Sequence, residues 1–275
     1  MKLTIKVLVI SIFTTLTFNI LAEVENSDNA PVIFVHGLGV PTFPYEHLIP
    51  LKKMFNEHKL NLYIAKFPAN VTFEEGARLV SKYIEEHVPN GKFHLVGHSM
   101  GGLISRLVIN KYPVGKRCLS LTSLATPHRG SLIADFVIKY WDSMEYKPVI
   151  SNILKIFGTN KAMIAQLTTA NMNNVFNSMV INNDQVKYYS LSFYIPNHVY
   201  ESTQNPILIA LNRLNAKLGH PYNDGLVSLT SQHWGEDLGT MTGDHWSETA
   251  PIPFDGKLIY RDVFSVVIKN INANF

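Results

Sequence analysis

Residues 97–101 have the types and spacing that could supply a serine nucleophile. They form a Gly-x-Ser-x-Gly segment around Ser99, between an apolar run at 93–96 and an apolar-periodic stretch at 102–112. A serine in this setting is typical of a sharp strand-to-helix turn that exposes its hydroxyl. The glycines leave out the Cβ atoms that would otherwise collide across the bend. The pattern therefore predicts nucleophilic chemistry at Ser99, and an ordinary glycine-rich turn is the alternative.

A serine hydroxyl is a weak nucleophile, so Ser99 needs a histidine base and an acid that orients that base. On this kind of turn the chain order is serine, acid, histidine, which excludes the earlier histidines, namely His36, His47, His58, His87, His94 and His98. The best acid is Asp224, because Gly225 accepts a positive φ and lets the turn aim the carboxylate at a neighbouring loop. Asp237 and Asp244 are alternatives, and Asp224 could also simply cap its own turn.

The best candidate for the base is His245, which follows Asp224 in a loop-like segment with Gly243 for bending. His233 is the alternative, although its position close behind a strand edge makes contact with Ser99 less favourable. Outside such a motif, either histidine would more often have a surface or packing role.

Two backbone N–H groups are expected to stabilise an oxyanion beside Ser99. One belongs to the residue after the nucleophile, Met100, and the other to a loop that follows an early strand. Leu38 lies in the segment 36–39, directly after the apolar run 31–35, and its flanking glycines let the backbone approach a substrate. In the alternative interpretation these glycines only shape a turn.

The elements that must position these residues alternate along the chain. Strand candidates are 31–35, 60–67, 93–96, 119–124 and 187–194, and Thr72 with Glu75 forms a capping box at the start of a helix. This order predicts an α/β fold with a mostly parallel central sheet and helices on both faces.

The interval 131–180 interrupts the order with apolar residues at helical spacing and four of the eight methionines. Its position over the carboxyl ends of the strands favours a helical lid that lines an acyl site, with plain packing helices as the alternative.

The chain has 275 residues, of which 46% are hydrophobic and 16% charged, and these values fit one globular domain. Lys2 and Lys6 precede an uncharged run from Val7 to Ala22, a pattern typical of a secretory signal peptide. The run is shorter than the roughly 20 residues of a spanning helix and contains several polar residues, so a membrane anchor is the weaker reading. We expect a signal peptide at 1–22, a single domain at 23–275, and a secreted or periplasmic location without a stable membrane span.

Charge and cysteine content exclude further classes. The net charge of +3 is small and the basic residues are dispersed, so a nucleic-acid partner is not expected. Cys118 is the only cysteine, which excludes an intramolecular disulfide and a paired redox site. Its apolar neighbours indicate a small buried side chain.

Five segments, taken together and in order, resemble secreted bacterial triacylglycerol lipases of the α/β-hydrolase fold: 36–39, 97–102, 126–131, 167–169 and 223–227. The likeness extends from Pro31 to about Ser247. It implies Ser99 as nucleophile, Asp224 as acid, His245 as base, the amides of Leu38 and Met100 at the oxyanion, and a mobile helical lid.

The chain departs from this family in two respects. Many relatives bind structural calcium through an aspartate two residues after the catalytic histidine, where this chain has Ser247. No cofactor is therefore expected, and calcium is doubtful, with Asp244 and Glu248 as the remaining acids nearby. Some relatives also contain a disulfide, which Cys118 cannot form. The loop 126–131 is interpreted as structural, with His128 and Arg129 as hydrogen-bonding supports.

These features predict a secreted serine hydrolase that cleaves lipid esters at an interface through an acyl-enzyme. A soluble carboxylesterase, a polyester depolymerase and an acyltransferase are alternatives on the same machinery, and a non-catalytic binding protein is an alternative of another class.

Overall fold

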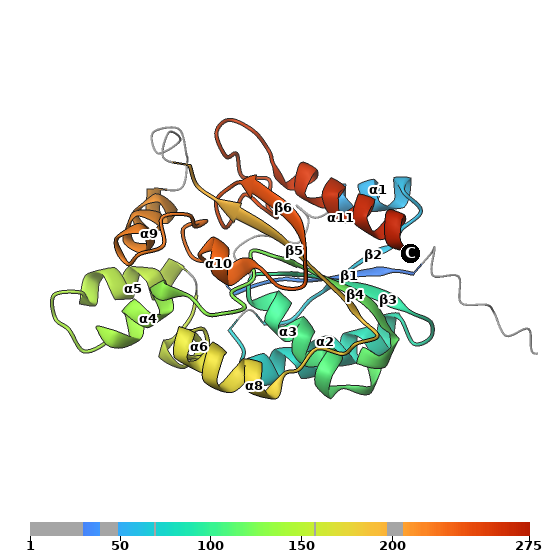
Figure 1. The fold of residues 1–275 in the computed structure, drawn as a ribbon, viewed down its shortest axis with the longest axis horizontal. Helices are drawn as coiled ribbons and strands as arrows, with labels where there is room; N and C mark the ends of the chain where they lie inside the picture. Colours follow the sequence, from blue (N-terminus) through green and yellow to red (C-terminus); the bar gives the residue numbers. More distant parts are fainter. Residues whose placement is uncertain (1–29, 39–48, 69, 157, 197–205) are drawn as a thin grey trace, which may run out of the picture.

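Six parallel strands form one sheet in the order β2-β1-β3-β4-β5-β6 (Figure 1). The computed structural model describes residues 30–38, 49–68, 70–156, 158–196 and 206–275. The strands of the sheet are β1 (Val32–Val35), β2 (Leu62–Ala65), β3 (Phe93–His98), β4 (Cys118–Leu124), β5 (Lys187–Tyr194) and β6 (Glu236–Thr242). All pairings among them are parallel. Their carboxyl ends therefore lie at one edge of the sheet, where Ser99 follows β3.

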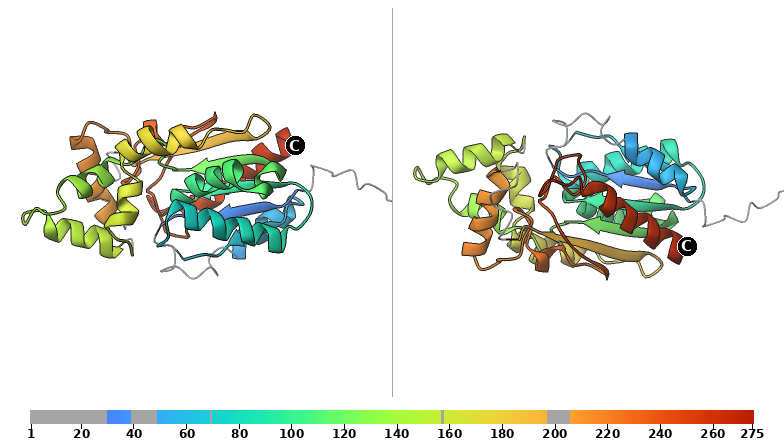
Figure 2. Two further views of the ribbon diagram at one scale, coloured as in Figure 1. Left: turned by 90° about the horizontal axis from the view of Figure 1, so that it is seen from below. Right: turned by 90° about the horizontal axis from the view of Figure 1, so that it is seen from above.

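Helices cover both faces of the sheet, as the sequence predicts (Figure 2). Helices α1 (Ile49–Glu57) and α11 (Tyr260–Asn274) pack on one face, and α2 (Phe73–His87) and α3 (Met100–Lys111) pack on the other. Alternate residues of β1 enter two different hydrophobic clusters, with Val32 and Phe34 facing α11 and Ile33 and Val35 facing α3. Burial on both faces explains why this strand is a continuous apolar run.

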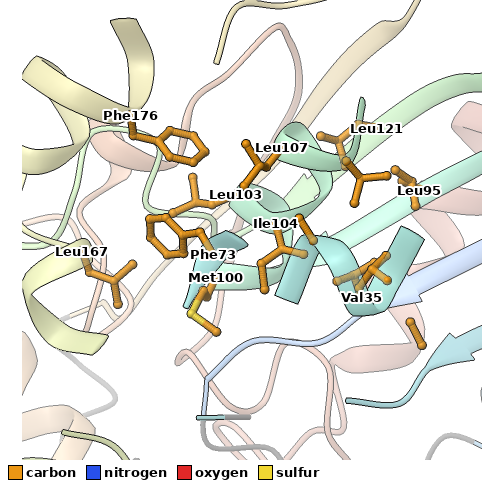
Figure 3. Packing of buried hydrophobic residues seen from close by; sticks show 14 of the residues in the cluster. Val35, Phe73, Leu95, Met100, Leu103, Ile104, Leu107, Leu121, Leu167 and Phe176 are labelled. Atoms are coloured by element: carbon orange, nitrogen blue, oxygen red, sulfur yellow. The ribbon is translucent and has the colours of Figure 1, made fainter. Parts of the chain in front are cut away.

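The larger cluster joins the sheet, α3 and the helical insertion (Figure 3). Leu95 and Leu121 come from the strands, Leu103 from α3, and Leu167 and Phe176 from the insertion, and all are buried. Because the insertion shares this core, its inner side is fixed to the helix that begins directly after Ser99.

The insertion between β4 and β5 is helical, as expected for 131–180. It contains α4 (Leu132–Lys139), α5 (Lys147–Ile156), α6 (Lys161–Gln166), α7 (Thr169–Asn171), the π-helical turn η5 (Met172–Phe176) and α8 (Asn177–Met179). In Figures 1 and 2, α4, α5 and α6 lie beyond the carboxyl ends of the strands together with α9 (Pro206–Lys217), whereas α8 lies beside α3. Of its four methionines, Met163 and Met172 are buried in packing, whereas Met144 and Met179 are 78% and 62% exposed. The sequence suggested that these methionines form an apolar surface, but only two of the four lie at the surface.

Arg106 connects the C-terminal end of this insertion to α3 through hydrogen bonds. Its guanidinium donates hydrogen bonds to Asn177 Oδ1 at 2.9 Å and to the Val180 carbonyl at 3.0 Å. The same group lies 3.7 Å from the centre of the Trp234 ring, and the residue is 2% exposed. Burial lowers the pKa of Arg106 to about 10, which leaves it charged at neutral pH.

Local sequence signals located the first five strands to within about two residues at each end. Thr72 is the N-cap of α2, and its hydroxyl accepts from the Glu75 N–H at 3.1 Å. The sequence analysis named no element after 194, so α9, α10 (Leu229–Gln232), β6 and α11 were missed, as was α1. Strand β6 is a half-exposed edge strand without an apolar run, which is why periodicity did not show it.

Replacing Gly101 by alanine should destabilise the fold strongly. A Cβ at this position would overlap the Val35 carbonyl oxygen and lie 2.6 Å from the His36 carbonyl oxygen, and both are backbone atoms at the end of β1. We expect a loss of about 3 kcal/mol or more in the free energy of unfolding, measured by urea denaturation. Gly158→Ala is the comparison, because only its positive φ of 53° is strained and nothing lies within 4 Å, so it should lose about 1 kcal/mol. Equal losses at both positions would contradict the close approach of α3 and β1.

None of the helices in the described residues has the length and apolar character needed to cross a bilayer. The expected signal peptide at 1–22 lies outside the described residues, and so does Gly39 of the loop that follows β1.

Candidate active site

Ser99 occupies the strained turn between β3 and α3. Its φ of 54° and ψ of −127° are unusual for a residue with a side chain, and its N–H donates to the Leu124 carbonyl at 2.9 Å. A Cβ on Gly97 would lie 2.5 Å from the Gly102 Cα, so glycine is needed for the arms to pass each other. The turn places the Ser99 hydroxyl at the carboxyl edge of the sheet, as the motif predicts.

The structure brings Ser99, His245 and Asp224 into one chain of hydrogen bonds. The Ser99 Oγ lies 2.9 Å from His245 Nε2, and His245 Nδ1 lies 2.8 Å from Asp224 Oδ2. The His245 N–H also donates to the Asp224 carbonyl at 3.0 Å, so the two loops are joined through the backbone as well. The Asp224 side chain is fully buried and that of His245 is 5% exposed. This geometry suits a base that takes a proton from Ser99 while the acid fixes its tautomer.

The Asp224 carboxylate is held in place by hydrogen bonds that it accepts at both of its oxygens. Oδ1 accepts from the backbone N–H groups of Leu226 and Val227, both at 2.8 Å. Oδ2 accepts from Gln232 Nε2 at 3.2 Å in addition to His245. Gln232 is buried and also bonds the Val227 carbonyl, so it fixes the turn and its carboxylate together.

The alternative residues lie outside this chain of hydrogen bonds. His233 is partly exposed and its Nδ1 lies 3.8 Å from Asp237, whose carboxylate also accepts from the Gly239 N–H. Asp244 caps its own turn by accepting from the N–H groups of Trp246 and Ser247. Asp224 and His245 therefore remain the candidates for the acid and the base.

Two backbone segments meet at the position expected for an oxyanion. Met100 begins α3, so its N–H has no acceptor within the helix. A Cβ on Gly37 would lie 2.8 Å from Ser99 Cβ and 3.3 Å from its Oγ, so the loop that carries Leu38 passes directly beside the nucleophile.

His36 holds this loop in place. Its ring stacks on Phe67 at 4.0 Å, and its nitrogens lie 2.8 Å from the Gly37 carbonyl oxygen and 3.1 Å from that of Phe67. Burial lowers the pKa of His36, so the ring is neutral at physiological pH. His36 therefore has a supporting role, in agreement with its exclusion as the base.

Replacing Gly37 by alanine should impair chemistry more than stability. The added methyl group would press on Ser99 and displace the backbone that carries the Leu38 N–H, so we expect a loss of about 10²-fold in kcat. Ester hydrolysis and urea denaturation of the same preparation would measure both effects. A variant that loses stability in proportion to activity would argue against this placement of the oxyanion loop.

The loop 126–131 has the structural role that the sequence suggested. The His128 ring is buried, lies 3.0 Å from the Ser123 hydroxyl and stacks on Trp234 at 5.1 Å. Arg129 donates to the carbonyls of Thr230 and His233. Both residues join this loop to the segment after Asp224.

Sequence reasoning missed three polar residues beside the site. Gln232 supports Asp224, as described above. His98 Nε2 lies 3.1 Å from Glu248 Oε2, and the His98 ring lies 4.9 Å from that of His245 at an angle of 38°. His98 is inside the turn motif, and Glu248 lies three residues after His245 in a chain with few acids, which were the available signals.

The residues near His245 do not fit the calcium site of the resembled family. Ser247 stands at the relevant position, the Asp244 carboxylate is engaged by backbone donors, and the Glu248 carboxyl faces His98. His98, His245 and Glu248 place potential ligand atoms within 4.8 Å of one another, but two of the three are imidazoles, which calcium does not favour. The expectation of an enzyme without a metal remains a prediction.

Comparison with known proteins gives a family for this arrangement. Residues 64–223 match the family described as the alpha/beta hydrolase fold. Triacylglycerol lipase 2 of Saccharomyces cerevisiae is 33% identical over 204 residues, which are 71% of this chain and 59% of that protein. A triacylglycerol lipase of Pseudarthrobacter phenanthrenivorans is 32% identical over 153 residues, which are 50% of this chain and 46% of that protein. The chain thus spans about half the length of these relatives.

Solved structures agree on the fold. The mature Bacillus licheniformis lipase BlEst2 superimposes with a TM-score of 0.66 at 19% identity over 90% of this chain and 94% of that one. The metagenomic carboxyl esterase MGS0156 superimposes with a TM-score of 0.70 at 16% identity, over 90% of this chain and 77% of that one. The matched segment, the parallel sheet and the serine turn agree with one another, and the chain belongs to the alpha/beta hydrolase fold family.

Proposed function

We propose that this protein is a serine hydrolase that cleaves carboxylic esters of lipids, with Ser99 as nucleophile, His245 as base and Asp224 as acid. The single observation that carries the proposal is the chain of hydrogen bonds from Ser99 through His245 to Asp224, at 2.9 and 2.8 Å, on the strained turn after β3. The names of the relatives, lipases and esterases, support ester substrates.

The reaction proceeds through an acyl-enzyme. His245 Nε2 removes the Ser99 proton while Oγ attacks the ester carbonyl carbon, and the N–H groups of Leu38 and Met100 stabilise the oxyanion. The intermediate collapses when the alkoxide leaves with the proton from His245. Water then loses a proton to the same nitrogen and attacks the acyl carbon, and His245 gives that proton to the Ser99 oxygen as the fatty acid is released.

The surroundings of the site favour an apolar acyl group. The helical insertion lies over the carboxyl edge of the sheet, and Met144 and Val149 are exposed on its surface. Tyr222, which follows α9 in the chain, is exposed as well. Apolar side chains left in water are stabilised when an interface covers them, which supports a lid that opens against lipid. The expected export signal at 1–22 supports a substrate outside the cytoplasm, and N-terminal sequencing of the mature protein tests that part.

A substrate series tests the proposal. Hydrolysis of p-nitrophenyl esters from acetate to palmitate, together with emulsified triglyceride, should show activity that persists with long chains and rises on the emulsion. Activity limited to short soluble esters would favour a carboxylesterase, and transfer to an added alcohol in preference to water would favour an acyltransferase. A fluorophosphonate probe that labels the wild type but not Ser99→Ala would separate a working site from a non-catalytic binding protein.

A further inference from the structure

Glu248 is a fully buried carboxyl group beside the proposed catalytic residues, and the reaction described above does not use it. Its side chain is 0% exposed. Oε2 lies 3.1 Å from His98 Nε2, and within the described residues Oε1 has no donor aimed at it. An ionised carboxylate left in this state would be very unfavourable, because a buried charge needs a counter-charge and donors for both oxygens.

The groups that face Glu248 are two acids and two imidazoles. The acids are Asp224 and Asp244, and the imidazoles are His98 and His245. Glu248 and Asp224 also share a side-chain hydrogen bond. Two carboxyl groups can share a hydrogen bond only when one of them holds a proton. Since Asp224 already accepts from backbone N–H groups, Gln232 and His245, the proton belongs on Glu248.

Electrostatics agree with this assignment. Burial, with the charges of Asp224 and Asp244, raises the pKa of Glu248 well above its ordinary value. Burial also lowers the pKa of His98 well below its ordinary value, with a further contribution from His245. The His98–Glu248 contact is therefore a hydrogen bond between neutral groups and not an ion pair.

We propose that Glu248 is a positioning residue held as a neutral carboxylic acid, which joins His98 to Asp224 and so holds the acid of the active site in line with His245. The proposal rests on the proposed function. Its two contacts connect the turn at Ser99, the turn at Asp224 and the turn at His245, which come from three separate parts of the chain. One proton on Glu248 thus links the segments that carry the three reacting side chains.

The pH profile of kcat/KM for a soluble ester distinguishes a neutral acid from an anion. Glu248→Gln keeps a carbonyl and adds N–H donors, so the pH midpoint of the acidic limb should stay within about 0.3 units of the wild type. Glu248→Ala removes the donor to Asp224, which leaves that carboxylate more basic and stabilises the His245 imidazolium, so the midpoint should rise by about 0.5–1 unit. If Glu248 were an anion, both variants would remove a negative charge and both midpoints would fall, which would overturn the proposal.

Thermal stability as a function of pH tests the same point without a substrate. A carboxyl with a raised folded-state pKa contributes stability that is complete below its unfolded value of 4.5 and is lost as the pH rises through the folded value. Glutamine undergoes no such loss. The Tm of Glu248→Gln relative to the wild type should therefore rise between pH 4 and pH 8, by about 3 °C or more.

Glu57→Gln is the matched control, because Glu57 is exposed at the end of α1 and should change neither measurement. A Tm difference for Glu248→Gln that stays flat or falls with pH would show an ionised Glu248 and reject the proposal. If the wild type hydrolyses no ester at all, the proposed function fails, whereas the thermal measurement still decides the protonation state of Glu248.

Discussion

Ser99→Ala should abolish ester hydrolysis, with kcat reduced by about 10⁵-fold or more. The hydroxyl lies 2.9 Å from His245 Nε2, and without it no covalent intermediate can form on the turn. Only the background from backbone donors and substrate binding would remain. Release of p-nitrophenol at saturating substrate, followed over hours, would measure the residual rate.

The fold of the Ser99→Ala variant must be intact for this result to count. The substitution removes a single oxygen, and far-UV circular dichroism and the Tm should match those of the wild type. Ser265→Ala is a suitable control, since the Ser265 hydroxyl bonds only within α11, to the Arg261 carbonyl at 2.9 Å. A folded Ser99→Ala protein that keeps more than a hundredth of the wild-type rate would refute the assignment of the nucleophile.

Asp224→Asn should reduce kcat by about 10⁴-fold. The two carboxylate oxygens accept from two backbone N–H groups, Gln232 and His245, so an amide NH₂ meets a donor in either orientation. If the NH₂ faces His245, the imidazole must adopt the tautomer with the proton on Nε2, which cannot accept from Ser99. If it faces the backbone, the turn at 224–227 loses two hydrogen bonds. Initial rates at neutral pH, compared at equal folded fraction, would measure the loss.

Asp237→Asn provides the matched comparison, since Asp237 is the exposed alternative acid and lies outside the hydrogen-bonded chain. It should retain wild-type kcat. Reversal of the two results, with Asp237→Asn inactive and Asp224→Asn active, would require a different loop arrangement from the one described.

The sequence predicted the features that local patterns encode. The apolar runs at 31–35 and 93–96 located buried strands because both faces of each strand are covered. The glycines around Ser99 marked the turn because the backbones on its two sides approach so closely that a Cβ atom would collide with the other segment. Chain order then reduced eleven histidines to a few candidates for the base.

The remaining features depend on contacts between distant parts of the chain. Strand β6 pairs only with β5 and carries polar side chains at an exposed edge, so no periodic signal distinguishes it from a loop. Gln232 and Glu248 gained their roles from folding, through contacts with Asp224 and His98. Nothing in the sequence around Gln232 marks it, and the position of Glu248 near His245 does not by itself predict its contact with His98. Long-range polar contacts of this kind are not visible in residue patterns.

The Arg106 anchor restricts which part of the insertion could move. It holds the trailing end at Asn177 and Val180, while the Asp135 carboxylate accepts from the Thr169 N–H at 2.9 Å and its hydroxyl at 2.7 Å. A movement of the insertion that kept both sets of contacts would have to take place between Asp135 and Thr169, in the stretch that includes α5 (Lys147–Ile156). Such a movement would leave Ser99, His245 and Asp224 at their present separations, because their hydrogen bonds involve no residue of that stretch.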